Sequence, residues 1–132
     1  MPLRRHAAAL LLACGLWQAG VPAQAMPVPV PQRIVSLDLC SDWILGEHAQ
    51  RSQVAALSAM GNRFDAPYGA SAGWPSHDGS LEQVIALAPD LVLVGPYNAP
   101  RLRQRLTSRG VRVEVTPLPT SLAGVADFET RG

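Results

Sequence analysis

The sequence predicts an α/β fold: a small parallel sheet with helices on both faces. Residues 80–88 have a Ser cap and the apolar spacing of an amphipathic helix, and Pro89 ends that helix. Residues 91–94 (Leu-Val-Leu-Val) are continuously apolar and precede Gly95, which is typical of a parallel strand covered on both faces. Shorter apolar runs and helical patterns alternate elsewhere, as in βαβ units.

Residues 1–25 are predicted to be a signal peptide. Arg4 and Arg5 precede an apolar run, and residues 23–25 (Ala-Gln-Ala) have the small-x-small pattern that signal peptidase recognises, so we expect cleavage after Ala25. The apolar run falls short of the ~20 residues that span a bilayer, which favours export over a permanent anchor. We therefore expect a periplasmic protein.

The composition after residue 25 excludes some partners. Nine arginines, no lysine and ten acidic residues give a net charge of −1. We expect no nucleic-acid partner, because nucleic-acid binders carry a concentrated basic face. Cys40 is the single cysteine in this part of the chain, so we expect either a buried thiol or a thiol that pairs with another molecule.

The first elements follow from proline, capping and apolar patterns. Residues 26–32 alternate proline with other residues, which predicts an extended leader. A short strand is expected at residues 34–37, and Ser41 is expected to cap a helix over residues 43–48. A second strand is expected at residues 54–57.

Residues 58–79 form the least regular region and the expected binding region. They are rich in glycine and proline and exceed the ~12 to 15 residues of an ordinary loop, which favours a functional loop. They also follow a strand, and ligands of α/β folds bind outside the carboxyl ends of the strands. We therefore expect ligand contacts from this loop.

Five side chains are candidate ligand contacts. Trp74 is expected in an open cleft, because a tryptophan in a glycine- and proline-rich loop does not easily become a core residue. Arg63 offers a planar guanidinium to an anionic ligand. His77 and Tyr68 are potential iron ligands, although a hydrogen-bonded histidine is the simpler interpretation and no spacing indicates a metal site. Tyr97 follows the strand at 91–94 and is expected on the same edge.

The remaining elements complete a repeated strand–helix pattern. Residues 99–109 predict an amphipathic helix with leucines inward and arginines outward, which Gly110 ends. Residues 111–115 predict a fourth strand, and Ser121 is expected to cap a further helix. The motifs typical of nucleotide-binding and hydrolase folds are absent from the sequence, so we expect no enzymatic activity.

Three segments carry a family resemblance. Residues 33–37 (RIVSL), 80–95 (SLEQVIALAPDLVLVG) and 109–113 (RGVRV) resemble the amino-terminal lobe of the periplasmic substrate-binding proteins of ABC importers for ferric siderophores, haem and cobalamin. The resemblance covers residues 33–125. It implies an exported, monomeric solute receptor that has no cofactor and no catalytic residue, and that delivers an iron chelate, haem or a corrinoid to an inner-membrane permease.

The resemblance also assigns domains and a docking residue. It implies one Rossmann-like lobe over residues 33–120, while residues 121–132 begin an interlobe helix that leads to a second lobe. Glu82 matches a glutamate that pairs with arginines of the permease, although a carboxylate in the first turn of a helix is also explained by the helix dipole.

Two alternatives remain open from the sequence. The first is an exported α/β enzyme that uses strand-end residues, with Asp38, Cys40 and His77 as candidates for nucleophile and base. The second is a half-length product that acts as an interaction module or has no function.

Overall fold

The computed structural model describes residue 20 and residues 22–64 and 66–130. Within them, five parallel strands form one sheet in the order β3–β2–β1–β4–β5. The strands are β1 (Ile34–Ser36), β2 (Val54–Ser58), β3 (Ser76–His77), β4 (Leu91–Val94) and β5 (Val113–Val115). The helices are α1 (Leu39–His48), α2 (Met60–Arg63), α3 (Leu81–Ala86), α4 (Pro100–Thr107) and α5 (Leu122–Thr130).

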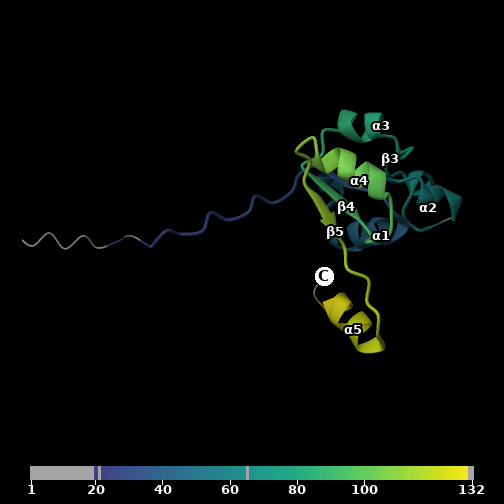
Figure 1. The fold of residues 1–132 in the computed structure, drawn as a ribbon. Helices are drawn as coiled ribbons and strands as arrows, with labels where there is room; N and C mark the ends of the chain where they lie inside the picture. The colour runs from purple at the N-terminus through teal and green to yellow at the C-terminus, as the bar shows by residue number, and fades with distance from the viewer. Residues whose placement is uncertain (1–19, 21, 65, 131–132) are drawn as a thin grey trace, which may run out of the picture.

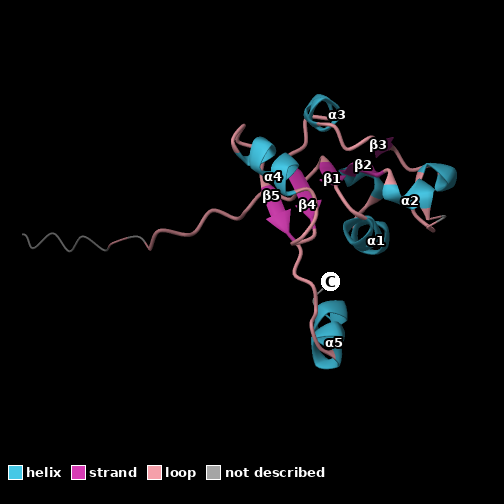
Figure 2. Cartoon of the chain, turned by 45° about the vertical axis from the view of Figure 1, so that its right-hand side comes forward, coloured by secondary structure: helices cyan, strands magenta, loops and turns pink. Residues whose placement is uncertain are grey.

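Helices cover both faces of the sheet, which confirms the predicted fold class. Helix α1 lies on one face, and α3 and α4 lie on the other (Figure 2). Ile34 points toward α1 and its neighbour Val35 points toward α3 and α4, because successive side chains of a strand alternate between faces. The strands are buried on both faces for this reason, and their continuous apolar runs follow from it.

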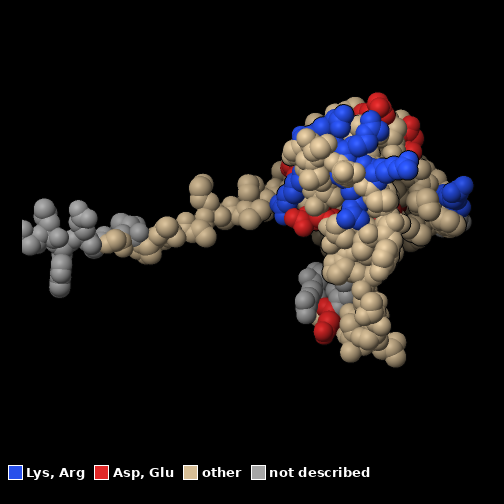
Figure 3. All heavy atoms as spheres, in the orientation of Figure 1, with Lys and Arg blue, Asp and Glu red and all other residues tan. Residues whose placement is uncertain are grey.

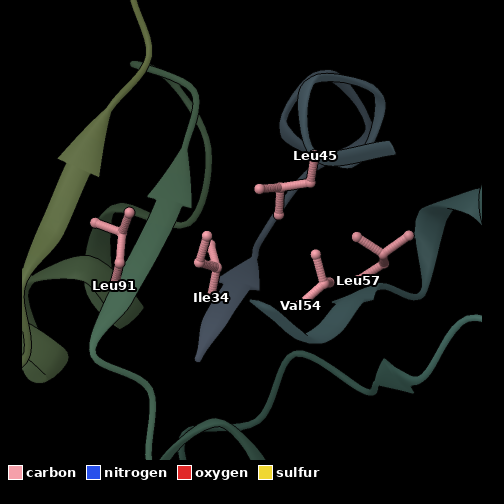
Figure 4. Close-up of a cluster of buried hydrophobic side chains, with 5 residues drawn as sticks. All are labelled: Ile34, Leu45, Val54, Leu57 and Leu91. Atoms are coloured by element: carbon pink, nitrogen blue, oxygen red, sulfur yellow. The ribbon is translucent and has the colours of Figure 1, made fainter. Parts of the chain in front are cut away.

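Two buried clusters form the core. The α1-side cluster combines Leu45 of α1 with strand residues, most of them at the amino ends of their strands (Figure 4); its members are Ile34, Leu45, Val54, Leu57 and Leu91. The opposite cluster joins α3 and α4 to β1 and β4 and contains Val35, Leu81, Val84, Val92 and Leu106. Leu106 is fully buried there, as its inward position in the amphipathic pattern predicts.

The cap of α1 corrects the sequence prediction. The helix begins at Leu39 rather than at residue 43, and its cap is Asp38, whose side chain accepts a hydrogen bond from the Ser41 backbone N–H. Ser41 is therefore inside the helix and is not its cap. An aspartate three residues before the bonded N–H satisfies the first turn as well as a serine does, so composition alone did not distinguish them.

Ser80 caps α3, as the sequence predicts. Ser80 Oγ accepts from the Gln83 N–H at 3.2 Å, as expected. The Gln83 side chain, however, accepts from the Asp78 N–H at 2.9 Å and not from the Ser80 N–H, which instead donates to the Asp78 carboxylate. The helix ends at Ala86, ahead of Pro89.

The long loop contains more structure than the sequence indicated. The segment between β2 and α3 includes α2, a short 3-10 helix over Ala70–Ala72, and β3, which pairs with the end of β2. Strand β3 was missed because two residues carry no periodicity. Gly110, with φ of +80°, ends the turn after α4 as predicted, and Ser121 Oγ caps α5 by accepting from the Gly124 N–H.

The assignments of the extended leader and of the signal peptide, which precede the lobe, stay predictions. Residues 26–32 form neither helix nor strand and are mostly exposed. The predicted signal peptide, residues 1–25, lies largely outside the described residues. Among the helices that are described, none is long and apolar enough to cross a membrane.

Candidate functional site

The candidate site is the edge of the sheet at which the five parallel strands end, which we call the carboxyl edge. In open α/β sheets, ligands bind at this edge where the strand order reverses. Here the order reverses between β1 and β4. The segments that follow these strands, Leu37–Asp38 and Gly95–Asn98, therefore meet at the central position of the carboxyl edge.

Asp38 joins the segments that follow β1 and β4 through hydrogen bonds at the position where the strand order reverses. Its carboxylate is buried and accepts from the Ser41 N–H at 2.9 Å, from Ser41 Oγ at 3.1 Å and from the Gly95 N–H at 2.5 Å. A Cβ at Gly95 would meet Asn98 Nδ2 at 2.9 Å, so glycine leaves room for the Asn98 side chain in this segment. Asp38 therefore has a structural role, since its carboxylate caps α1.

Asp42 is a buried carboxylate that the sequence analysis missed. It is fully buried and accepts from the Ser58 N–H at 2.8 Å and from Ser58 Oγ at 2.6 Å, which ties α1 to the end of β2. Burial raises the pKa of Asp42 above its ordinary value, while hydrogen bonds from Ser36 and Ser58 oppose that rise and the charge of Asp38 adds to it. The four-residue spacing from Asp38, one helical turn, was the available signal.

His77 is a buried structural residue, which corrects its assignment as a ligand contact. Its Nδ1 accepts from the Gly79 N–H at 2.9 Å, so Nε2 carries the hydrogen and donates to the Ser36 carbonyl oxygen at 2.6 Å. The side chain is 4% exposed. Both ring nitrogens are thus occupied, and neither is available for iron or for general-base chemistry.

Trp74 and Tyr68 pack together on the α1 side of the sheet. Their rings meet edge to face, with centroids 6.1 Å apart, and both pack against the α1-side cluster. The Arg51 guanidinium carbon lies 4.6 Å from the centroid of the Trp74 ring, and Arg51 also bonds the Gly73 carbonyl. Trp74 is thus half-buried and packs on the outside of the core, because a distant cluster and Arg51 provide its packing surface.

Tyr68 is held by the end of α1. Its ring lies so close to Gly46 that a Cβ at that position would clash with it, and its hydroxyl donates to the Glu47 carboxylate. Glu47 is near the carboxyl terminus of α1, which runs away from the carboxyl edge. Trp74 is thus placed in packing contacts away from that edge, whereas Tyr68 also lines a groove together with Leu39 and Thr116. Contact of either ring with a ligand stays a prediction.

Three other predicted residues are exposed at elements that follow the strand ends. Tyr97 is 84% exposed just after β4, and Arg63 is exposed at the end of α2, which follows β2. Glu82 is exposed in the first turn of α3, shortly after β3. The pKa of the nearby Asp78 is lowered because Ser80 donates hydrogen bonds to its carboxylate, which fixes the turn before Glu82.

An apolar groove lies beside the carboxyl edge. It has a volume of about 480 Å³ and runs between α1 and the segment after β5. Its walls are almost entirely apolar and consist of Leu39, Cys40, Asp42, Trp43, Ile44, residues 66–68 and residues 116–119. Cys40 is exposed, so the expected buried thiol is wrong. In the described part of the chain, no cluster of three or more His, Cys, Asp or Glu residues is placed to hold a metal ion.

Arginines gather on a different part of the surface. Figure 3 shows basic side chains over the side of the molecule that carries α4, and Arg101, Arg105 and Arg109 are exposed there. This distribution follows the outward arginine positions of the predicted helix. Arg63 does not belong to this group of arginines, because it lies on a different element, α2.

Comparisons with solved structures agree with the resemblance. A periplasmic haem-binding protein from Pseudomonas aeruginosa aligns with 77% of this chain and 37% of its own length at 23% identity and a TM-score of 0.57. A possible iron-binding periplasmic solute-binding protein from Staphylococcus epidermidis aligns with 76% of this chain and 40% of its own at 21% identity and a TM-score of 0.60. A periplasmic vitamin B12-binding protein of Vibrio cholerae aligns with 74% and 38% at 22% identity and a TM-score of 0.56.

These matches concern the fold. No family model and no curated protein matches the sequence. The structural neighbours are described as binding proteins rather than enzymes. The chain therefore has the fold of one part of the periplasmic solute-binding proteins for haem, iron and vitamin B12, and it spans about two fifths of their length.

Proposed function

We propose that the chain is the amino-terminal lobe of an exported solute-binding protein of an ABC importer. It captures haem, a ferric siderophore or a corrinoid in the periplasm and delivers it to the inner-membrane permease. The observation that carries the proposal is the parallel sheet with the order β3–β2–β1–β4–β5, which aligns with the haem-, iron- and vitamin B12-binding proteins at TM-scores of 0.56 to 0.60.

Ligand contacts come from exposed residues at the carboxyl edge. The Tyr97 ring is free to lie against a flat, largely apolar macrocycle. The Arg63 guanidinium is free to form paired hydrogen bonds with carboxylates of an anionic chelate or of haem. A second lobe outside this chain supplies the opposing wall of the cleft, since the chain spans about two fifths of the aligned proteins.

Delivery uses the exposed carboxylate of Glu82. It stands in the first turn of α3, on a helix that is fixed by the Ser80 cap and packed through Leu81 and Val84. A rigidly held surface charge is suited to pair with a permease arginine, because charged pairs set the orientation and the association rate of two proteins. We further propose that the receptor acts as a monomer.

The enzyme alternative has less support from the geometry. The Asp38 carboxylate is bonded to Ser41 and Gly95, and the His77 ring is bonded to Ser36 and Gly79. Both candidates for a general base are thus committed to structural hydrogen bonds. Cys40 is exposed in an almost entirely apolar groove, and the His77 ring bonds Ser36 and Gly79 rather than Cys40.

Ligand binding by the two-lobed protein tests the proposal. Haemin, a ferric siderophore and cobalamin are titrated separately, and one of them is expected to bind at micromolar concentration or below. Tyr97→Ala and Arg63→Ala should each weaken that binding about tenfold, which corresponds to the loss of one contact. Arg105→Ala, on α4, is the matched control and should leave binding unchanged. Failure of all three ligands to bind would refute the proposal that the chain belongs to a solute receptor.

Uptake measurements test the permease contact separately. Glu82→Gln removes the charge and keeps the size of the side chain. It should leave the affinity for the ligand unchanged while it lowers uptake by cells. An equal loss of affinity and uptake would place Glu82 in the ligand site, and unchanged uptake would remove the docking role.

A further inference from the structure

Helix α2 carries Arg63, the proposed contact for an anionic ligand, at the margin of the lobe (Figure 1). It has four residues, and none of their side chains belongs to either core cluster of the described chain. Phe64, which follows the helix, is 59% exposed. A helix of this length is not stable by itself. Hydrogen bonds, rather than apolar packing, must therefore fix the position of α2.

Ser58, the last residue of β2, provides the bond at the start of α2. The N-cap position of the helix is occupied by Ala59, and alanine has no side-chain acceptor for the free N–H groups of a first turn. Ser58 Oγ accepts from the Met60 N–H at 3.2 Å and so takes over this role. The Ser58 side chain thereby links the sheet to the first residue of α2.

Asp42 of α1 fixes the direction of the Ser58 hydroxyl. Ser58 Oγ donates its hydrogen to one carboxylate oxygen of Asp42 at 2.6 Å, and the Ser58 N–H donates to the other at 2.8 Å. A hydroxyl has one hydrogen and two lone pairs, so donation to Asp42 leaves a lone pair of Oγ for the Met60 N–H. Both side chains are buried, and a low dielectric strengthens such bonds. The bonds thus run from α1 through the end of β2 to α2.

Arg63 lies within one helical turn of the bonded residue Met60. The Phe64 N–H donates to the Met60 carbonyl at 3.1 Å and closes this turn. Asn62 Oδ1 accepts from the Ala70 N–H at 2.7 Å, which joins α2 to the loop that follows it. Loss of the bond at the start of α2 would therefore release the turn that carries the guanidinium.

We propose that Ser58 and Asp42 are positioning residues for Arg63. The Asp42 carboxylate orients the Ser58 hydroxyl, the hydroxyl fixes the start of α2, and α2 places the Arg63 guanidinium for the ligand. Ordering a mobile segment on binding costs free energy, and a segment that is already fixed removes that cost. The inference rests on the proposed ligand contact of Arg63.

Amide hydrogen exchange in the full chain tests the anchoring without a ligand. The Phe64 N–H reports on α2, because its bond to Met60 must open before exchange. Ser58→Ala should raise its exchange rate about tenfold, a factor within the range for one lost helix cap. Ser41→Ala is the matched control, since Ser41 is also buried but its hydroxyl bonds Asp38, and it should change the rate less than about twofold. Ser58→Thr keeps the hydroxyl and should retain the wild-type rate.

Two exchange results would overturn the proposal. The first is exchange of the Phe64 N–H in the wild type at the rate of an unstructured peptide, a measurement that does not require any variant to fold. The second is an equal change in rate for Ser58→Ala and Ser41→Ala, because a general loss of stability would then explain both.

A double-mutant cycle in the two-lobed protein tests the link to Arg63. The probe is whichever of haemin, a ferric siderophore and cobalamin the wild type binds. Ser58→Ala should weaken that binding about threefold, because the apparent dissociation constant rises as the fraction of molecules with α2 in place falls. In an Arg63→Ala background, Ser58→Ala should cause no measurable further change.

The outcomes of the cycle separate this inference from the proposed function. Equal weakening by Ser58→Ala in the two backgrounds would show that Ser58 does not act through Arg63 and would overturn the inference. Failure of the wild type to bind any of the three probes would refute the receptor, and the exchange rates would still decide whether Ser58 fixes α2.

Discussion

The buried carboxylate of Asp42 permits a quantitative test of how α1 is attached to the sheet. Asp42 is fully buried and accepts two hydrogen bonds from Ser58, which is itself 3% exposed. Asp42→Ala removes both acceptors and leaves the Ser58 N–H and O–H without an acceptor in a buried site, while Ser58 Oγ still accepts from the Met60 N–H. The change is therefore expected to destabilise the lobe.

The size of the effect follows from the two orphaned groups. Each buried polar group without a partner costs about 1 to 3 kcal/mol. Part of that cost is offset, because the variant no longer desolvates a carboxylate, and burial is the main cause of the raised pKa of Asp42. We expect a net loss of about 2 to 3 kcal/mol, which is a large share of the 5 to 15 kcal/mol of a typical domain.

Urea unfolding followed by tryptophan fluorescence measures this loss. Glu82→Ala is the matched control, since Glu82 also lies in the first turn of a helix but is exposed. The control should lose less than about 1 kcal/mol, the scale of a helix-dipole interaction. If the loss in free energy of unfolding for Asp42→Ala lies within about 0.5 kcal/mol of the control, the reasoning is refuted, because the buried hydrogen bonds then contribute no measurable stability.

The pH dependence provides a second readout. The pKa of Asp42 is raised in the folded protein above its ordinary value of 3.8, so the folded state binds this proton more tightly than the unfolded chain does. As the pH rises above 3.8, the unfolded chain loses the proton first and the stability of the wild type falls until the pH passes the folded pKa. Asp42→Asn keeps an acceptor and cannot titrate. The stability of the wild type relative to this variant should therefore decline over that range, and a constant difference would contradict the assignment.

Two further predictions concern other packing contacts. Trp74→Ala should lower the free energy of unfolding by about 2 kcal/mol, because the half-buried ring packs on the α1-side cluster and under Arg51. This loss is smaller than the loss expected when a fully buried tryptophan is removed. A change below about 0.5 kcal/mol in urea unfolding would place the ring in solvent. Asp90 accepts from the Gln32 and Arg33 N–H groups, which lower its pKa against an opposing effect of burial. The ionised Asp90 stabilises the fold above the ordinary pKa of 3.8, and this contribution is lost as the pH falls. Asp90→Asn should therefore reduce the loss of stability at acid pH. If the dependence of stability on pH is unaltered in this variant, the stabilising role of the Asp90 hydrogen bonds is excluded.

Local patterns predicted the regular elements well. The cap, periodicity and stop around α3, and the continuous apolar run of β4, depend on residues close together in sequence, so they were identified directly. The parallel sheet followed because runs buried on both faces require covering helices. Strand β3 has two residues and was missed, since its existence depends on pairing with β2.

The candidate site was predicted less well, because its residues are defined by distant partners. His77 was considered for a ligand, but its nitrogens bond Ser36, forty-one residues away, and Gly79. Trp74 was expected in a cleft, yet its surroundings include Arg51 and the α1-side cluster. Tyr97 and Arg63 are exposed at elements that follow strand ends, and the order of the elements along the chain placed them there in advance.

The sequence by itself determined the fold class of this protein, its helix stops and the edge at which exposed side chains gather, because these depend on short-range periodicity and on strand direction. The tertiary structure alone decided which polar groups are buried, which aromatic rings pack and which apolar surfaces stay open. The physical reason is that burial and hydrogen-bond satisfaction are properties of contacts between residues far apart in the chain, and no local pattern specifies those contacts.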